Sequence, residues 1–212
     1  MQQAWPFVAA TGVPAYGGLV TRVIADISMS LDGFVTGPDA GPENGLGSGG
    51  EPLHAWVFGD DPVDAEVLRS STEATGAVVM GRRLFDVVDG PQGWNEDVGY
   101  GAGHAATPPF FVVTHAPPAE VRLDLDFTFV AGLAEAVDRA RAAAGDRDVF
   151  VMGGGDVVGQ AVEAGLADEL RIHLAPVLLG GGTPLFGTWR AELVQTSSVA
   201  SAYATHLTYR AR

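Results

Sequence analysis

Two short apolar segments, each followed at once by glycine and then by a helical pattern, constrain this chain more than any other feature. GAVVMG (76–81) runs directly into RRLFDVVDG (82–90), and DVFVMG (148–153) runs through two further glycines into a helical pattern over roughly 156–165. Strands that are apolar throughout are typical of a sheet covered on both faces, which favours parallel strands joined by helices. The two junctions therefore predict an α/β fold with glycine at the passage from strand to helix.

The remaining segments alternate in the same way. Strand-like patterns occupy 22–30, 110–115, 126–132 and 169–180, helical patterns occupy 62–75 and 133–144, and 192–210 predicts a final hairpin. We therefore predict a single three-layer α/β/α domain over 21–212, with a mostly parallel central sheet and antiparallel C-terminal strands. Residues 1–20 are predicted to be a loose N-terminal extension. The glycine- and proline-rich residues 31–50 are predicted to be a long loop, either a mobile lid or disordered.

Composition excludes several classes of function. The 212 residues carry 26 acidic and 12 basic side chains, a net charge of −14, which argues against binding a nucleic-acid backbone. All basic side chains are arginine, so a lysine Schiff base is excluded. The absence of cysteine excludes thiolate nucleophiles and cysteine-based zinc sites, and it fits a reducing cytoplasm. No apolar run approaches the ~20 residues that span a bilayer, and no metal site is predicted.

Ligands of open α/β sheets bind beyond the carboxyl ends of the strands, where both glycine junctions lie. Glycine lets backbone N–H groups approach a phosphate, and a helix N-terminus adds partial positive charge. Arg82 and Arg83 add fork-shaped donors suited to a phosphate monoester. The alternative to a phosphate site is that Gly153–Gly155 only form a tight strand-to-helix turn, and that Arg82 and Arg83 are solvated surface side chains.

Four segments stand in a recognisable order: VIADISMSLDGFVTG, VVMGRRLFD, FFVVTH and VFVMGGGDVVGQAVEAGLADELRIHLAPVLLGGGTPLF. In this order and spacing the chain resembles the dihydrofolate reductase-like superfamily over roughly residues 21–190. Within it, the chain resembles free-standing bacterial forms of the RibD C-terminal reductase domain of riboflavin biosynthesis. The resemblance implies a homodimeric, NADPH-dependent reductase of a small carbonyl, imine or pterin-like substrate, similar to 5-amino-6-(5-phosphoribosylamino)uracil reductase.

The resemblance also implies where NADPH would bind. The strand–glycine–arginine junction would hold its 2′-phosphate, the triple glycine would face its pyrophosphate, and the end of the first strand would flank its nicotinamide. The cofactor-binding residues implied are Ile27, Ser28, Gly81, Arg82, Arg83, Thr114, His115, Gly153, Gly154, Gly155, Asp156 and Val157. As in dihydrofolate reductases, the Gly153–Gly154 peptide is a candidate for the cis form. Asp156 departs from relatives with arginine there, and would either repel phosphate or cap the helix.

Asp32, His54 and Trp56 are the predicted catalytic residues. Asp32 matches a loop position of the riboflavin-pathway reductases, although an Asx turn before Gly33 explains it as well. His54 and Trp56 are candidates to line the substrate pocket, and a histidine can supply the proton that accompanies hydride addition. The alternative is that His54 and Trp56 only pack, in the core or on the surface, and take no part in catalysis. Gly180–Gly182 would contact substrate or simply form a turn.

The substrate is left open by the sequence. Folate reduction needs a buried carboxylic acid on the first helix, and Asp60, Asp61, Asp64 and Glu66 are candidates by position, although none stands in the familiar local motif. Without cysteine, the zinc deaminase of fused riboflavin enzymes has no counterpart here. The alternatives are a non-catalytic nucleotide- or ligand-binding protein, a dihydrofolate reductase, and a flavin- or phosphosugar-binding enzyme.

Overall fold

The computed structural model describes residues 21–95, 98–100, 107–187 and 190–211, so the predicted extension 1–20 lies outside the described residues. Eight strands form the main sheet: β1 (Val23–Ser30), β3 (Thr75–Gly81), β4 (Phe110–Val113), β5 (Phe127–Val130), β6 (Asp148–Met152), β7 (Glu169–Ala175), β9 (Leu193–Ala200) and β10 (Thr205–Ala211). Their order is β5-β4-β3-β6-β1-β7-β10-β9. A separate pair joins β2 (Phe34–Thr36) to β8 (Thr183–Pro184).

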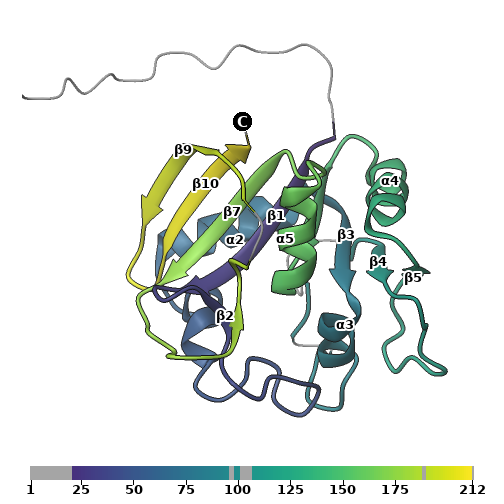
Figure 1. The fold of residues 1–212 in the computed structure, drawn as a ribbon, viewed down its shortest axis with the longest axis horizontal. Helices are drawn as coiled ribbons and strands as arrows, with labels where there is room; N and C mark the ends of the chain where they lie inside the picture. Colours follow the sequence, from purple (N-terminus) through teal and green to yellow (C-terminus); the bar gives the residue numbers. More distant parts are fainter. Residues whose placement is uncertain (1–20, 96–97, 101–106, 188–189, 212) are drawn as a thin grey trace, which may run out of the picture.

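The sheet is mixed, as the sequence predicts. The neighbours from β5 across to β7 are all parallel. β10 then runs antiparallel to both β7 and β9, so the C-terminal hairpin forms one edge of the sheet (Figure 1). The predicted fold class is confirmed.

Helices cover both faces and make three layers. α4 (Leu133–Ala144) and α5 (Gly155–Glu163) lie on one face. The other face carries η1 (Glu51–His54), α1 (Ala55–Phe58), α2 (Pro62–Ala74) and α3 (Arg82–Val88). α2 begins where the sequence predicts, because the Asp61 side chain accepts a hydrogen bond of 2.8 Å from Val63 N, and Pro62 occupies the first turn.

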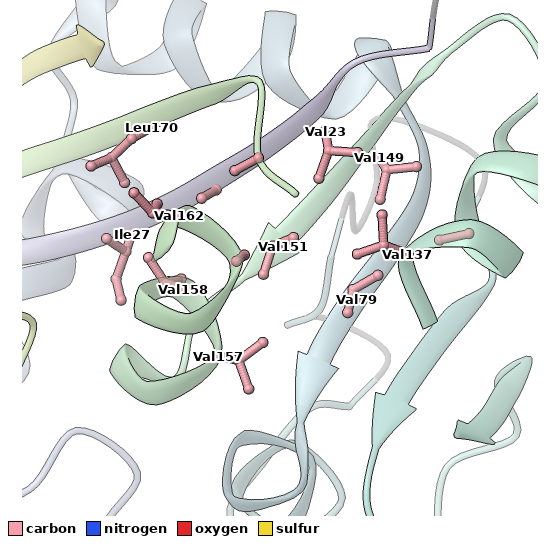
Figure 2. Packing of buried hydrophobic residues seen from close by; sticks show 14 of the residues in the cluster. Val23, Ile27, Val79, Val137, Val149, Val151, Val157, Val158, Val162 and Leu170 are labelled. Carbon is pink, nitrogen blue, oxygen red and sulfur yellow. The ribbon is translucent and has the colours of Figure 1, made fainter. Parts of the chain in front are cut away.

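The alternation of side chains along each strand divides the core in two. On one face, Val157, Val158 and Val162 of α5 pack over Ile27 and Val151 of the sheet (Figure 2). The opposite face holds a second apolar cluster, in which Phe85 of α3 covers the strand residues Val78, Met80, Phe110 and Val112. Continuous apolar strands are therefore buried on both sides, which is why they read as unbroken runs in the sequence.

Several predicted boundaries and loops are wrong in detail. β7 ends at Ala175, five residues before the predicted end at Gly180. Residues 31–50 are not an unstructured loop, because they contain β2 and internal backbone bonds such as Gly37 N to Leu46 O at 2.7 Å. Such bonds satisfy polar backbone groups that an open loop would leave to water.

The expectation of a cis peptide is also wrong. No peptide bond among the described residues is cis. Gly153 and Gly154 instead turn the chain with φ angles of +60° and +75°, a left-handed conformation that glycine adopts without a Cβ clash.

No helix in the described part of the chain is long and apolar enough to cross a membrane.

Gly76→Ala tests the packing of α4 on β3. A Cβ atom at Gly76 would lie 2.5 Å from the Ala144 carbonyl oxygen and 2.8 Å from its Cα, so helix or strand must move. We expect the free energy of unfolding to fall by about 1–3 kcal/mol, measured by urea denaturation. Gly41→Ala is the control, since nothing lies within 4 Å of its Cβ, and equal stability of the two variants would contradict the prediction.

Candidate functional site

The two glycine junctions lie side by side at one edge of the sheet. β3 and β6 are parallel neighbours with Val79 opposite Val151, and Gly81 and Gly153 each follow two residues later. The helices that follow the two strands therefore begin at the same carboxyl edge of the sheet, where ligands of open α/β sheets bind. This arrangement is what two phosphate-binding junctions on one nucleotide require.

Each junction also packs against the helix of the other. A Cβ atom at Gly81 would lie 2.7 Å from Cγ2 of Val157 on α5, and one at Gly153 would lie 3.2 Å from Cδ2 of Leu84 on α3. A Cβ atom at Gly154, in contrast, would meet open space. Gly81 and Gly153 thus have a packing role whether or not a ligand binds, and Gly154 is the glycine that leaves backbone exposed.

The predicted arginine pair divides into two roles. Arg83 Nη1 lies 3.0 Å from Asp156 Oδ2, and this exposed ion pair joins the starts of α3 and α5. Gly154 is the N-cap of α5, and Asp156 lies in the first turn of the helix, where an acidic side chain interacts favourably with the helix dipole. Arg82 is half-buried, with Nε donating to Asp86 at 2.7 Å and Nη1 donating to the Ala116 carbonyl. Arg82 is therefore the more firmly positioned cation.

The end of β4 adjoins Arg82, as the resemblance implies. Thr114 N donates to Val130 O at 2.8 Å, and its hydroxyl bonds both N and O of Ala116 at 3.1 Å. The Arg82 guanidinium reaches the same Ala116, while His115 is exposed. The structure thus brings Arg82 and the Thr114–His115 pair to one place.

Ile27 and Ser28 of β1 face opposite sides of the sheet. Ile27 is buried beside Val158 in the core under α5, so its side chain is not available to a ligand (Figure 2). Ser28 is buried on the other face, where its hydroxyl accepts a hydrogen bond of 2.9 Å from Trp56 Nε1. Two residues that the sequence singled out for different reasons, Ser28 and Trp56, are therefore in direct contact.

Asp32 holds a loop. Its carboxylate accepts hydrogen bonds from the Ser30 hydroxyl at 2.6 Å, from Gly180 N at 2.7 Å and from Leu179 N at 3.1 Å. The Ser30 and Gly180 bonds lower the pKa of Asp32 to about 2, so it is ionised at neutral pH. Asp32 thus ties the β1–β2 turn to the glycine-rich segment after β7.

His54 is poorly suited to donate a proton. Burial, together with the charge of His173, lowers the pKa of His54 to about 4. Its imidazole is therefore neutral near pH 7, and it fits the role of a pocket-lining group better than that of an acid.

A buried polar cluster that the sequence analysis did not predict lies beneath α2. His173 of β7 and His206 of β10 meet at their Nδ1 atoms, 2.7 Å apart. His173 Nε2 lies 3.1 Å from Asp26 Oδ1, and His206 Nε2 lies 2.7 Å from Asp64 Oδ1. Trp56 covers both rings, with centroid distances of 4.1 Å and 5.3 Å. The sequence does carry a sign of this cluster, because Asp26 and His173 are polar residues inside otherwise apolar strands.

The structure distinguishes the four acidic residues that the sequence offered as the buried acid of folate reduction. Asp64 is 1% exposed, whereas Glu66 is exposed and bonds Arg69. Asp60 accepts from Tyr203 Oη at 3.0 Å, and Asp61 accepts from Ala202 N at 2.9 Å, so both fix the turn between β9 and β10. Asp64 is thus the buried carboxyl group that the sequence could not identify.

Among the described residues, no group of three or more acidic, histidine or cysteine side chains is arranged to hold a metal ion.

The family of the chain follows from comparison with known proteins. The model of the RibD C-terminal domain family matches residues 21–202, so this chain belongs to that family. YyaP, an uncharacterized protein of Bacillus subtilis (strain 168), is 22% identical over 172 residues, which cover 78% of this chain and 80% of YyaP.

Solved structures share the fold at low identity. A Shewanella sp. PV-4 protein assigned to riboflavin biosynthesis has a TM-score of 0.63 at 24% identity, covering 91% of this chain and 99% of its own. A pyrimidine reductase-like protein from Corynebacterium diphtheriae has 0.61 at 18%, covering 91% and 92%. Enterococcus faecalis dihydrofolate reductase, complexed with NADP(H), has 0.53 at 15%, covering 90% and 96%. The chain therefore has a dihydrofolate reductase-like fold.

Asp32→Ala tests the loop-holding role. We expect the amides of Leu179 and Gly180 to exchange with solvent roughly tenfold faster in the variant, because both lose a charge-assisted acceptor. Hydrogen exchange read by mass spectrometry measures this, with Glu43→Ala as the exposed control in the same region. Because the folded-state pKa is depressed, the effect of Asp32 is present above the ordinary aspartate pKa and is lost as pH falls through about 2. Unchanged exchange in Asp32→Ala would contradict the prediction.

Proposed function

We propose that this protein is an NADPH-dependent reductase that transfers a hydride to a small carbonyl, imine or pterin-like acceptor. The observation that supports it most is the adjacency of the β3 and β6 junctions at one sheet edge, with Arg82 beside them. Membership of the RibD C-terminal domain family supports a reductase. The structures that share its fold include a pyrimidine reductase-like protein and a dihydrofolate reductase.

The residues present fit a dinucleotide phosphate. The first N–H groups of α5, those of Gly155 and Asp156, have no acceptor within the helix, and Gly154 leaves the approach to them open. Arg82 would hold the 2′-phosphate, because its Nη2 atom makes no hydrogen bond to the described residues. Asp156 does not repel the phosphate as an unpaired charge would, because it forms an ion pair with Arg83.

The nicotinamide would lie near Ser28 and Trp56, at the carboxyl half of β1. When bound, NADPH supplies the hydride. The protein must then supply a proton to the oxygen or nitrogen of the acceptor. Asp64 is the proposed donor, because it is buried, its Oδ2 has no partner among the described residues, and it bonds His206, whose ring packs against Trp56.

One observation favours the rival function, a nucleotide-binding protein without catalysis. The Arg83–Asp156 pair leaves the phosphate junctions with less net positive charge than two free arginines would. Turnover of NADPH with any acceptor in a panel of carbonyls, imines and dihydropterins would eliminate this rival. The homodimer that the family resemblance implies stays a prediction.

Arg82→Ala tests the cofactor site. We expect the Kd for NADPH to rise about tenfold or more, with little change for NADH, because only NADPH carries the phosphate that Arg82 would bind. Titration of NADPH fluorescence measures both. Arg139→Ala is the control, since that arginine pairs with Glu135 on the exposed side of α4. Absence of saturable NADPH binding to the unmodified protein at millimolar concentration would end the proposal.

Asp64→Asn tests the proton donor. We expect kcat for NADPH oxidation to fall by about 10²-fold or more, while the Kd for NADPH changes little, because the amide keeps the shape but cannot supply the proton. Glu66→Gln on the same helix is the control and should retain kcat. If Asp64→Asn retains kcat in a folded protein, another group donates the proton.

A further inference from the structure

The short strands β2 and β8 form a ribbon that lies against the start of α5 (Figure 1). The contact is direct at Gly155, the first residue of the helix. A Cβ atom there would lie 3.1 Å from the Pro184 carbonyl oxygen and 3.2 Å from Cγ2 of Val35. Val35 and Leu185 are buried in the same apolar core as Val157 of α5. The ribbon therefore forms one side of the helix start whose N–H groups are the proposed phosphate donors.

The ribbon is too small to hold its own position. β8 contains only Thr183 and Pro184, and proline has no N–H to donate. Thr183 N donates to the Thr36 hydroxyl at 3.3 Å, and a backbone bond of 2.9 Å joins Leu185 N to Gly33 O. So short a strand pair has little stability of its own. Its place on α5 therefore depends on what fixes the segments that lead into it.

Asp32 fixes both of these segments. It stands in the turn between β1 and β2, and its carboxylate accepts from Leu179 N at 3.1 Å and from Gly180 N at 2.7 Å, on the segment that leads into β8. Ser30, fully buried at the end of β1, donates to the same carboxylate at 2.6 Å and accepts from Phe34 N of β2 at 3.0 Å. One set of bonds thus joins β1 to both strands of the ribbon.

A close backbone contact continues this path from Gly180 to β8. A Cβ atom at Gly182 would lie 1.9 Å from the Thr36 carbonyl oxygen, and the φ angle of Gly182 is +126°. The incoming segment therefore lies directly on β2, and a displacement at residues 179–180 must also displace β8, because packed groups transmit such shifts. The path from the Asp32 carboxylate to Gly155 is continuous.

The same bonds leave Asp32 poorly suited to proton transfer. Its Oδ1 accepts from Ser30 and Leu179, and its Oδ2 accepts from Gly180. An ionised carboxylate can only accept hydrogen bonds, so it has no proton to give to a reacting group. The geometry therefore favours a role in holding the backbone.

We propose that Asp32 is a positioning residue of the cofactor site. Through the β2–β8 ribbon it holds the first turn of α5 where the N–H groups can bind the diphosphate that NADPH and NADH share. This role rests on the proposed reductase function. It differs from the catalytic role that the sequence predicts for Asp32, because it acts on cofactor binding and not on the hydride step.

The first test uses the free protein. Val157 N and Val158 N donate to Gly154 O at 3.0 Å and 3.1 Å, so their amides report on the first turn of α5. We expect both to exchange roughly tenfold faster in Asp32→Asn, measured by NMR, because the side-chain amide keeps the shape but replaces one accepting oxygen with a donor. Glu43→Gln, an exposed site in the same loop, is the control. Unchanged exchange at both valines in folded Asp32→Asn would overturn the proposal.

The second test interrupts the same path without touching Asp32. In Gly182→Ala the new Cβ atom meets the Thr36 carbonyl oxygen, so β8 must move. We expect the first-turn amides of α5 to exchange faster, as in Asp32→Asn. Gly187→Ala is the matched control, since nothing lies within 4 Å of its Cβ atom. If Gly182→Ala alters exchange in the ribbon but not in α5, the ribbon does not position the helix.

Cofactor binding separates positioning from catalysis. Asp32→Asn should raise the Kd for NADPH and for NADH by the same factor, roughly fivefold or more, because both contain the diphosphate and the site loses preorganisation. Arg82→Ala, in contrast, is expected to affect NADPH selectively. The kcat at saturating NADPH should fall by less than the Kd rises. A fall in kcat of about 10²-fold with an unchanged Kd would assign Asp32 to the chemical step and overturn the proposal.

The outcomes also distinguish this proposal from the proposed function. If the unmodified protein binds both nucleotides and Asp32→Asn binds them equally well, the reductase proposal stands and the positioning role fails. If the unmodified protein binds neither, the reductase proposal fails together with the purpose assigned to Asp32. The exchange measurements then still decide whether Asp32 positions the start of α5.

Discussion

The close approach of two helices to the ends of two neighbouring strands organises this molecule. α5 can pack against the end of β3 only because Gly81 has no side chain where Val157 sits, and α3 approaches the end of β6 beside Gly153 for the same reason. Each helix therefore approaches the end of the strand that leads into the other helix. The result is a pair of helix starts at one sheet edge, held at a fixed separation and joined on the outside by the Arg83–Asp156 ion pair.

β1 connects this edge to the polar interior. Its alternate residues face two different environments, because Ile27 is part of the valine-rich core under α5 while Asp26 and Ser28 face the histidines under α2. The strand can serve both because each face is closed by a different helix layer. The same eight residues therefore support the glycine junctions and supply one end of the hydrogen-bonded histidine–aspartate chain.

The sequence predicts the fold well because the fold depends on local patterns. Uniformly apolar strands, the Asp61–Pro62 helix start and the alternating C-terminal hairpin each indicate their structure within about ten residues. The junction residues Gly81 and Arg82 were accessible in the same way, because strand, glycine and arginine are adjacent in sequence. Their proposed cofactor role rests on the family resemblance.

What the sequence could not indicate depends on contacts between distant segments. Asp32 bonds Gly180, Asp64 bonds His206 and Asp26 bonds His173, pairs that lie more than 140 residues apart. Whether a carboxyl group on α2 is buried depends on a hairpin at the far end of the chain. In the sequence, the four acidic residues between positions 60 and 66 therefore could not be distinguished. In the structure, the bond to His206 of β10 sets Asp64 apart as the buried one.

The buried polar chain is difficult to explain by stability alone. Two carboxyl groups and two imidazoles lose hydration here, and two buried carboxyl oxygens, Asp26 Oδ2 and Asp64 Oδ2, gain no hydrogen bond from the described residues in return. Well-packed apolar side chains of similar volume commonly stabilise such a site as well or better. Asp26 lies on a strand whose other face is packed with valine, so apolar residues suit this backbone. The stability of the fold therefore does not account for the four titratable groups in this position.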